Sequence, residues 1–442
     1  MKTSLLILLN KMVTFICNVF RKNGSVFPAS LVRPFDKNIL EKIKYPKYVI
    51  GVTGSSGKGS TTAMIAHILE TNNFKVVWNK SGSNVVNGTT TLILNNTKTF
   101  SHKLNCDVLL LEMDESYIKQ TFTKSTLTHL IITNITRDQP ARNGEPEMIL
   151  EKIKNSIDES VHLILNSDDP FVNRFTLLNN SYTTYGIDKT KSSFKEPLSN
   201  NLDASYCPVC QSKLKYKFYH YGHLGDYSCP NKDFKRNVSY LATNVDLKNK
   251  SFKVNNNEIK INKDVLFAVY YTLAAYTLCK VIGLNDEDIL KSLNEIPIKS
   301  KRLQALNFDN RVIEMVESKN ENNLSYFQSL KYINEYEGEK TIILGFDNVS
   351  RRYKYNDVSW LYDIDFEILD LNSIDKIFCI GRFKYDVYTR LRLADIDEDK
   401  LVLVDNIKDI TKLLKETKGT IFTMVCFDMT EILRKLFMEE NK

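Results

Sequence analysis

The stretch GVTGSSGKGSTT, at residues 51–62, constrains the fold of this chain more than any other feature. YVIGVT, at 48–53, is a short apolar run rich in β-branched residues, and the loop is followed by a segment with apolar residues on one helical face. A strand, a turn of glycines and small residues, and a helix in this order are typical of a phosphate-binding loop. Such a loop directs backbone N–H groups and the positive end of the helix dipole at an anion. We therefore expect an α/β domain that binds a nucleotide here.

Each residue type in this loop has an expected role. Gly54 and Gly57 allow the backbone to turn inward around the phosphates. Lys58 can reach the outer phosphates, and Ser60 or Thr61 can place a hydroxyl on Mg²⁺. The residues predicted to contact the nucleotide in this loop are Gly54, Ser55, Ser56, Gly57, Lys58, Gly59, Ser60 and Thr61.

Strand and helix patterns alternate through most of the chain. Further buried strands are expected at 108–113, 129–134 and 162–166. Because these apolar runs are continuous rather than alternating, they indicate a parallel sheet covered on both faces. Residues 190–260 break the pattern, and a buried helix at 265–283 closes the first domain. A second α/β pattern follows, with strands expected at 340–346, 376–381, 400–405 and 420–426, and it predicts a smaller doubly wound domain.

These patterns divide the 442 residues into three segments. Residues 1–46 are expected to form an amphipathic helix and a lead-in, residues 47–298 the ATP-binding domain, and residues 299–442 the C-terminal α/β domain. A cysteine-bearing insertion interrupts the ATP-binding domain at about 205–237. The basic stretch IPIKSKRLQ, at 296–304, is the expected hinge.

Composition narrows the class of protein. The content of 43% hydrophobic and 26% charged residues is that of a soluble globular protein. The net charge of +7 is mild for this length, so nucleic acid is not an expected partner. Of the 8 cysteines, three cluster and the others stand singly in apolar runs, which is not a disulfide framework and suggests a reducing compartment.

The N-terminal stretch MKTSLLILLNKMVTFICNVF has apolar residues at helical spacing. These residues are Leu5, Leu8, Leu9, Met12, Phe15, Ile16 and Val19. Lys11 interrupts the run and no small-residue cleavage site follows, so the stretch does not match a signal peptide, and it is too short to span a bilayer. We expect an amphipathic helix that either packs on the protein or lies on a membrane face.

The insertion carries part of a zinc ribbon. Cys207, Cys210 and Cys229 match three positions of a four-ligand pattern, but the fourth position is Lys232, a weak ligand at neutral pH. Either the metal has been lost or a neighbouring side chain completes the site. The side chains available for this are His220, His223 and Asp233. The two histidines can equally be interpreted as surface residues of the hairpin.

Several motifs together resemble the Mur ligase superfamily, whose members use ATP to join an amine to a carboxylate. GSSGKGST resembles the folylpolyglutamate synthetase form of the loop, with Gly59 as its extra glycine. LLEMDE, at 110–115, is similar to the acidic strand-end motif of the superfamily, which implies that Glu112 binds Mg²⁺. NSDDP, at 166–170, is similar to a motif near the nucleotide, which implies a nucleotide-binding role for Asp168.

Other segments resemble the MurT family, the Mur-ligase-like subunits of lipid II isoglutaminyl synthases. TNITRDQPARNGE, at 133–145, is similar to a MurT stretch, which implies that Asn134 and Arg137 lie at the nucleotide. The Cys ribbon and DVSWLYDIDFE, at 357–367, are similar to elements specific to that family. Two shorter matches complete the resemblance. Arg302 in the hinge matches an arginine of the family, which implies a further nucleotide-binding residue, and SKN at 318–320 is similar to a short family motif.

This resemblance implies a reaction and a partner. The ligase subunit uses ATP and Mg²⁺ to activate the α-carboxylate of D-glutamate in the stem peptide of lipid II as an acyl phosphate. Ammonia from a GatD glutamine amidotransferase then yields D-isoglutamine. The sequence agrees that a second chain makes the ammonia, because no cysteine stands with a histidine as a glutaminase nucleophile requires. The implied location is the cytoplasm, at the inner face of the membrane.

The resemblance further implies that Asp357 completes a Cys-His-Asp triad across the subunit interface, orienting its imidazole. An ordinary loop aspartate beside Trp360 is the alternative. Departures from the family favour other functions too. Pro140-Ala141 stands where the family usually has Leu-Asp. Ala268 and Tyr271 stand where Mur ligases commonly have asparagines near the nucleotide base. The alternatives are a folylpolyglutamate-synthetase-like or other Mur-type amino-acid ligase, and a catalytically degenerate regulatory subunit.

Overall fold

The computed structural model describes residues 2–22, 24–80, 83–122, 126–197, 203–295, 303–317, 321–348 and 357–440. The chain divides into two compact units. The first comprises Met1–Ile135, Glu145–Pro197 and Leu202–Ile298, and the second comprises Thr136–Gly144, Leu198–Asn201 and Lys299–Lys442. The predicted hinge lies mostly outside the described residues, which resume at Leu303.

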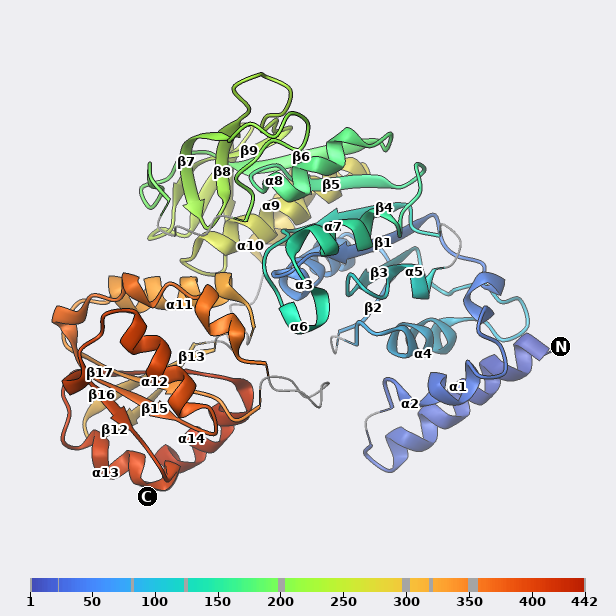
Figure 1. Ribbon diagram of the computed structural model, residues 1–442. Coiled ribbons are helices and arrows are strands. Elements are labelled where there is room, and N and C mark those ends of the chain that lie inside the picture. Colours follow the sequence, from blue (N-terminus) through green and yellow to red (C-terminus); the bar gives the residue numbers. More distant parts are fainter. Residues whose placement is uncertain are drawn as a thin grey trace. The chain divides into compact units, whose positions relative to one another are not determined.

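The first unit is built on a sheet with the strand order β11-β10-β9-β6-β5-β4-β1-β3-β2 (Figure 1). Its strands are β1 (Tyr48–Thr53), β2 (Val76–Trp78), β3 (Val108–Glu112), β4 (His129–Ile132), β5 (His162–Asn166), β6 (Tyr182–Ile187), β9 (Tyr240–Asp246), β10 (Ser251–Val254) and β11 (Asn257–Lys260). The strands from β2 to β9 pair in parallel, as the continuous apolar runs predict, and β10 and β11 pair antiparallel at one edge. The prediction of a parallel α/β sheet is thereby confirmed.

Helices cover this sheet. They are α1 (Lys2–Val19), α2 (Phe27–Val32), η1 (Ile39–Lys42), α3 (Lys58–Thr71), α4 (Val86–Asn96), α5 (Ile118–Thr121), α7 (Pro146–Lys154), α8 (Pro170–Asn173), η2 (Arg174–Leu177), α9 (Leu266–Val281) and α10 (Asp286–Asn294). Helix α9 is buried along most of its length and packs against α3. An apolar surface all round is what a helix inside a domain requires.

Five strands of this sheet were not predicted, namely β2, β6, β9, β10 and β11. Strands β10 and β11 lie within 190–260, where the sequence pattern indicated no sheet. Asn255 and Asn256 join them with φ angles of 48° and 69°. Two left-handed residues in succession form the tight turn that matches the twist of a hairpin, and asparagine tolerates this conformation well. A hairpin at a sheet edge buries only alternate side chains, so it lacks the continuous apolar run of a central strand.

The second unit has a smaller sheet with the order β12-β13-β17-β14-β15-β16. Its elements are α6 (Pro140–Asn143), β12 (Leu303–Phe308), β13 (Arg311–Glu317), α11 (Asn323–Glu335), β14 (Lys340–Gly345), η3 (Ser359–Asp363), η4 (Phe366–Ile368), η5 (Leu371–Ser373), β15 (Ile374–Ile380), α12 (Lys384–Leu393), η6 (Glu398–Lys400), β16 (Leu401–Leu403), η7 (Ile407–Asp409), α13 (Ile410–Leu414), β17 (Thr420–Val425) and α14 (Phe427–Glu440). The four predicted strands are present, and the hairpin of β12 and β13 adds two more.

A two-stranded ribbon is the third sheet. Strands β7 (Lys215–Tyr221) and β8 (Leu224–Ser228) pair antiparallel within the cysteine-bearing insertion. The cysteines pack at one end of this ribbon in a small cluster of their own with Leu214, Tyr227 and Phe234. The insertion therefore folds as a separate element of the first unit.

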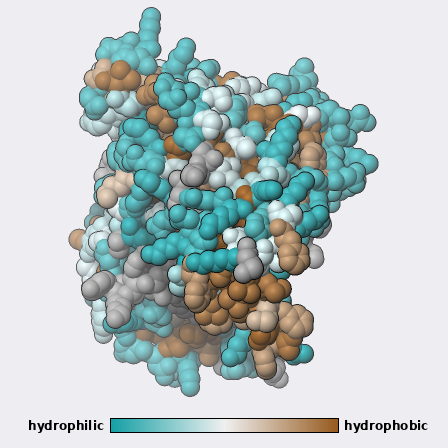
Figure 2. Space-filling view, turned by 90° about the vertical axis from the view of Figure 1, so that its right-hand side faces the viewer, coloured by the Kyte–Doolittle hydropathy of each residue, from teal (hydrophilic) through white to brown (hydrophobic). Residues whose placement is uncertain are grey.

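Helix α1 presents the apolar residues of its sequence pattern to solvent. Leu5, Phe15 and Val19 are 66%, 68% and 60% exposed. Figure 2 shows the resulting brown area on the face of the molecule that lies at the lower right in Figure 1. Leu6 and Ile7 on the opposite side are buried, where α1 packs against α2 and α4. The helix thus packs on the protein through one face only.

Candidate active site

The loop between β1 and α3 has the backbone of a phosphate-binding turn. Gly54 has a φ of +126°, and a Cβ at this position would lie 2.3 Å from Thr133 Oγ1, so no other residue fits without movement. Gly57, with a φ of +81°, precedes the first residue of α3, where the N–H groups of the helix point outward. The glycines at these two positions are explained by the turn itself.

Asn134, at the end of β4, holds the loop from behind. The Ser55 N–H donates to the backbone oxygen of Asn134 at 2.8 Å. The Ser56 N–H donates to Asn134 Oδ1 at 3.0 Å, while Asn134 Nδ2 donates to the Ser56 oxygen at 3.1 Å. Thr133 Oγ1 donates to that same oxygen at 2.7 Å. The structure therefore brings Asn134 to the predicted loop and gives it a positioning role there.

Lys58 already has an anionic partner. Its ammonium donates to Glu115 Oε1 at 2.9 Å and also to the Gly54 backbone oxygen. The Gly54 N–H donates to the same Glu115 oxygen at 3.1 Å. The carboxylate thus occupies the two donors that a phosphate would be expected to use. Glu115 is a site residue that the sequence interpretation missed, although it is the last residue of the quoted LLEMDE motif.

The oxygen ligands predicted for Mg²⁺ lie beside the first turn of α3. A Cβ built on Gly59 would be 3.2 Å from Glu112 Oε2, so the carboxylate stands directly against the loop. Asn84 Nδ2 donates to the other carboxylate oxygen at 3.2 Å. Ser60 is exposed at the same turn, whereas Thr61 is fully buried. Carboxylate and hydroxyl oxygens suit Mg²⁺, so Glu112 and Ser60 form a fitting donor set.

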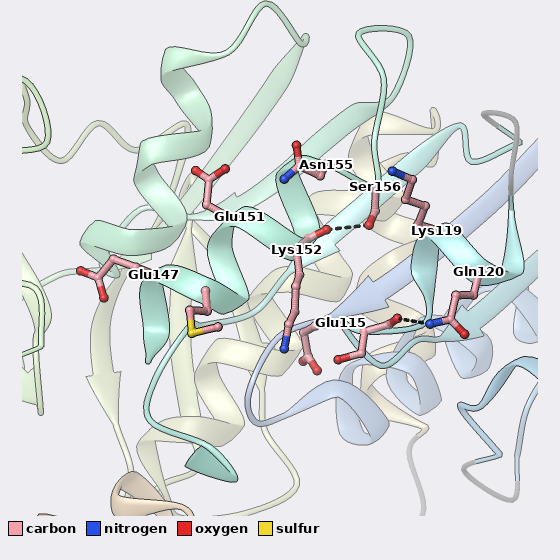
Figure 3. Close-up of a pocket in the computed structure, with 10 residues that line it drawn as sticks. Glu115, Lys119, Gln120, Glu147, Glu151, Lys152, Asn155 and Ser156 are labelled. Carbon is pink, nitrogen blue, oxygen red and sulfur yellow. Dashed lines mark hydrogen bonds between the residues drawn. The ribbon is translucent and has the colours of Figure 1, made fainter. Parts of the chain in front are cut away.

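A pocket of about 700 Å³ lies next to the loop, between α5 and α7 (Figure 3). Its lining includes Glu115 itself, so the pocket and the phosphate loop share a side chain. The other charged residues of the lining are Lys119, Glu147, Glu151 and Lys152. A pocket of this size with groups of both signs suits a polar ligand with charged groups.

Asp168 lies in a buried network. Arg236 Nε donates to Asp168 Oδ1 at 2.6 Å, and the Tyr270 hydroxyl donates to Oδ2 at 2.7 Å. The Ile187 N–H donates to Oδ2 at 2.8 Å. Burial lowers the pKa of Arg236, but Asp168, Tyr270 and Asp226 together raise it, and the net shift is upward. In the structure this aspartate links the ribbon, α9 and β6, and its contact with a nucleotide stays a prediction.

The two histidines of the insertion are buried rather than on the surface, which corrects the surface interpretation. His223 Nε2 lies 3.2 Å from Asp169 Oδ1, and this carboxylate raises the pKa of His223 against the opposing effect of burial. Burial lowers the pKa of His220, whose Nε2 lies 3.0 Å from the Ile187 oxygen. Both rings therefore support the aspartates that follow β5.

Asp233 stands with the three cysteines. The ligand atoms of Cys207, Cys210, Cys229 and Asp233 all lie within 4.8 Å of one another. Cys210 Sγ and Cys229 Sγ are 3.3 Å apart. The Val209 and Asn231 N–H groups point at Cys207 Sγ and Cys229 Sγ, as in the turns that orient thiolates around a metal. Three thiolates and a carboxylate fit tetrahedral zinc, with Asp233 in the fourth place instead of Lys232.

The remaining predicted residues belong to the second unit or lie outside the described chain. Arg137 pairs with Asp363 at 3.5 Å, beside the DVSW motif. Asp357 is half-buried, and its Oδ1 accepts the Ser359 N–H at 2.9 Å. Trp360 is buried against Tyr326 and Phe346. Arg302 and residues 318–320 lie outside the described residues.

Comparison with known proteins places the chain among its relatives. The family described as Mur ligase middle domain matches residues 52–232, and the family described as MurT ligase C-terminal matches residues 318–427. Subunit MurT of the glutamine-hydrolyzing lipid II isoglutaminyl synthase of Staphylococcus aureus is 28% identical over 417 residues, which cover 93% of this chain and 92% of that protein. The chain is therefore similar to MurT subunits along almost its whole length, and its C-terminal segment matches the MurT ligase C-terminal family. The corresponding MurT subunit of Streptococcus pneumoniae is 27% identical, over 94% of this chain and 92% of its own.

A solved structure shares the fold of this chain. The pseudomurein peptide ligase type C of Methanothermus fervidus superposes with a TM-score of 0.68 at 22% identity, covering 92% of this chain and 81% of that one. The resemblance to the Mur ligase superfamily and to the MurT family is thus confirmed, as is the expectation of an ATP-dependent ligase. The individual site residues and the domain boundaries stay predictions.

Proposed function

We propose that this chain is the ligase subunit of an amidating enzyme of cell-wall synthesis. Its acceptor is the α-carboxylate of D-glutamate in the stem peptide of lipid II, and its product is D-isoglutamine. The nitrogen comes from a GatD-like glutamine amidotransferase that forms a heterodimer with it. The relatives of S. aureus and S. pneumoniae, named as subunits of lipid II isoglutaminyl synthase, support this acceptor and this partner.

The observation that carries the proposal is the convergence of Lys58 and the Gly54 N–H on one carboxylate oxygen. Donors held on a rigid turn at a helix N-terminus stabilise an anion without reorganising during the reaction. The terminal phosphate of ATP would take the place of the Glu115 carboxylate at these donors. The displaced Glu115 lines the adjacent pocket, so the acceptor and the phosphate can meet there.

The chemistry needs an activated acceptor. A carboxylate is a poor electrophile at neutral pH, so one of its oxygens first attacks the terminal phosphorus of ATP, and ADP leaves. Ammonia then attacks the acyl carbon and orthophosphate leaves, which forms the amide bond. Lys58 neutralises charge on the phosphoryl group during its transfer. Mg²⁺, held by Glu112 and Ser60, would supply further neutralisation of the phosphate oxygens.

We further propose a structural zinc ion in the ribbon and a location at the inner membrane face. The donor set of Cys207, Cys210, Cys229 and Asp233 supports the metal. The lipid-linked acceptor supports the location, because such a substrate stays at the bilayer surface. Asp357, on the second unit, would complete the catalytic triad of the glutaminase partner.

Isotope transfer tests the central step. The complex is supplied with ATP, glutamine and a muropeptide acceptor whose α-carboxylate carries oxygen-18. We expect one labelled oxygen in each orthophosphate released, because the attacking carboxylate oxygen leaves with the phosphate. A Lys58→Met variant should lose turnover by about 100-fold or more. Label that stays wholly in the amidated product during confirmed turnover would contradict the proposal.

The same assay separates the alternatives. An amino-acid ligase would consume ATP with a free amino acid in place of ammonia and would not depend on the glutaminase. A degenerate regulatory subunit would show no ATP turnover that depends on Lys58.

A further inference from the structure

Helix α1 is attached to the protein through polar side chains. Asn10 is fully buried, and its Nδ2 donates to Asn95 Oδ1 at 2.9 Å. Lys11 Nζ donates to the Thr97 oxygen at 2.6 Å, and Thr14 Oγ1 donates to Asn95 Oδ1 at 3.2 Å. These contacts fix one face of α1 on α4 and the turn that follows it. Leaving this position would break these bonds and would expose the buried side chains of Leu6 and Ile7 to water.

The opposite face of α1 is a continuous apolar stripe. Its residues follow each other at intervals of three or four positions and continue just past the helix end. They are Leu5, Leu8, Met12, Phe15, Ile16, Val19 and Phe20, each between 45% and 71% exposed. Of the 24 exposed large hydrophobic residues among those described, 11 fall between Leu5 and Phe35. A soluble protein does not usually concentrate apolar surface in this way without something to cover it.

The neighbouring helix extends this surface. Helix α2 contacts α1, and its Phe27 and Leu31 are 52% and 40% exposed. We name the exposed apolar residues of α1 and α2, with Phe20 between them, the N-terminal apolar face. Figure 2 shows the α1 part of this face as an unbroken brown area.

Charge identifies what covers this face. Residues 1–35 contain Lys2, Lys11, Arg21, Lys22 and Arg33 and no aspartate or glutamate. Arg21 and Lys22 are exposed directly after the apolar stripe, and Lys2 is exposed at its other end. Basic residues at both ends of a helix whose outer face carries leucine and phenylalanine are the pattern of an interfacial helix on an anionic lipid surface.

The contacts of α1, and not its length, exclude a spanning role. Among the described residues, α1 is the one helix that is long and apolar enough to cross a membrane, with 18 residues, so the expectation that it is too short was wrong. However, Leu6, Ile7 and Asn10 are buried against the protein, and Lys11 is bonded to it. A helix held along one side by its own domain can offer only its other side to lipid.

We propose that the N-terminal apolar face docks the enzyme on an anionic bilayer, with α1 lying parallel to the surface. The inference extends the proposed function, on which it rests for the membrane location of the acceptor. Docking would keep the ligase at the surface where a lipid-linked substrate resides and would raise the local concentration of both. The apolar side chains enter the boundary between headgroups and acyl chains, and Lys2, Arg21 and Lys22 face the headgroups.

Vesicle flotation of the full-length chain tests the proposal. Wild-type protein is mixed with vesicles of phosphatidylglycerol and phosphatidylcholine, and with vesicles of phosphatidylcholine alone. We expect flotation with the anionic vesicles, at least about tenfold stronger than with the neutral ones. A Leu8→Gln/Phe15→Gln variant should lose at least about tenfold in partition, and so should Arg21→Glu/Lys22→Glu. A matched control, Tyr385→Gln/Leu393→Gln, alters two side chains of similar exposure on α12 and should float like the wild type.

Three outcomes would overturn the inference. Wild-type protein that fails to float with anionic vesicles contradicts it directly. A Leu8→Gln/Phe15→Gln variant that floats normally but changes from dimer to monomer in light scattering would assign the face to a second copy of the chain. Loss of flotation when the glutaminase partner is added would assign the face to that partner.

A second readout keeps this inference distinct from the proposed function. Amidation of a water-soluble muropeptide should be unchanged in Leu8→Gln/Phe15→Gln, because the face lies outside the phosphate loop and its pocket. Amidation of lipid II in vesicles should fall in the same variant. Flotation without any amidation would contradict the proposed function and leave the docking surface standing.

Discussion

At the residue scale, one carboxylate controls the phosphate loop. Glu115 binds Lys58 and the Gly54 N–H, and only 3% of its side chain is exposed. A buried ion pair contributes little net stability, since desolvation offsets much of the attraction. Its consequence for the proposed function is competition, because the proposed ATP phosphate would reach Lys58 only when Glu115 gives way.

Glu115→Gln tests this competition. The amide keeps an oxygen for both donors but removes the charge, so a non-hydrolysable ATP analogue should bind about three- to tenfold more tightly. Isothermal titration of the full chain with Mg²⁺ and this analogue measures the change. Glu112→Gln is the control, because it removes the charge of a proposed Mg²⁺ ligand and should weaken nucleotide binding. Weaker binding by Glu115→Gln would mean that the carboxylate itself serves the nucleotide.

Asp357 is expected to act for the partner. Its side chain accepts the Ser359 N–H, which fixes the carboxylate at the start of η3. Asp357→Asn should reduce glutamine-dependent amidation by about 100-fold or more, while activity with added ammonium salts stays near that of the wild type. Parallel rate measurements with the two nitrogen sources check this. Equal losses with both would assign Asp357 to the ligase step or to folding.

At the element scale, the ribbon and the central strands each hold a group of titratable side chains that the sequence pattern did not explain. The ribbon brings Asp233 to the three cysteines through the turn around Lys232, whose φ is +66°. The central sheet places His129 on β4 directly opposite His162 on β5, with ring centroids 5.7 Å apart. The turn brings Asp233 to the cysteines, and the pairing of β4 with β5 brings the two histidines together.

The ribbon should bind one zinc ion. Metal analysis of the purified chain is expected to find about one zinc per molecule, and Asp233→Ala should lower its affinity by about 10- to 100-fold. Lys232→Ala, at the neighbouring position, should leave the affinity unchanged. Zinc that is retained in Asp233→Ala but lost in Lys232→Ala would refute this donor set.

The histidine pair should make stability depend on pH. Burial, and then the charge of His162, lowers the pKa of His129 to about 4, and burial lowers the pKa of His162 as well. Below about pH 6.5 these histidines are protonated in the unfolded chain but stay neutral in the folded chain. The free energy of unfolding therefore decreases as the pH falls toward 4. Urea unfolding at pH 7 and pH 5 should show this loss, and His129→Asn should reduce it by about 1 to 2 kcal/mol. An equal loss of stability between pH 7 and pH 5 in His129→Asn would exclude His129 as its cause.

At the scale of the whole molecule, two separate cores support two units. One core contains Trp360, Phe346 and the strands of the second sheet, and another contains β1, β3 and β4 of the first. The chain passes from the first unit to the second after Ile135 and returns at Glu145. The TNITRDQPARNGE stretch is therefore divided, with Asn134 in one unit and Arg137 in the other.

Separate cores predict separate unfolding. Trp360→Ala removes a buried ring from the second core and should destabilise that unit by about 3–5 kcal/mol. Calorimetry of the full chain should then show one transition moved to lower temperature and another, the one shifted by ADP, unchanged. A single transition that moves as a whole would mean that the two units unfold as one.

Elements with a local signal could be predicted from the chain alone. The phosphate loop, the parallel strands β1, β3, β4 and β5, and helix α9 are of this kind, because glycine geometry and continuous apolar runs depend on neighbouring residues. The parallel strands β2, β6 and β9 were not predicted. Hairpins β10–β11 and β12–β13 were not predicted either, since a hairpin at a sheet edge is only half-buried. Their signal was the residue pairs that take left-handed turns, Asn255-Asn256 and Asp309-Asn310.

Which side chains meet depends on how the elements pack together. The sequence could not assign Glu115 to Lys58, Asp233 to the cysteines, or His223 to Asp169, because each pair joins through the packing of different elements. The sequence of α1 likewise predicted an apolar face but not whether that face points to the protein or to solvent. The apolar stripe points to solvent because the buried amide of Asn10, on the opposite side of the helix, is hydrogen-bonded to α4.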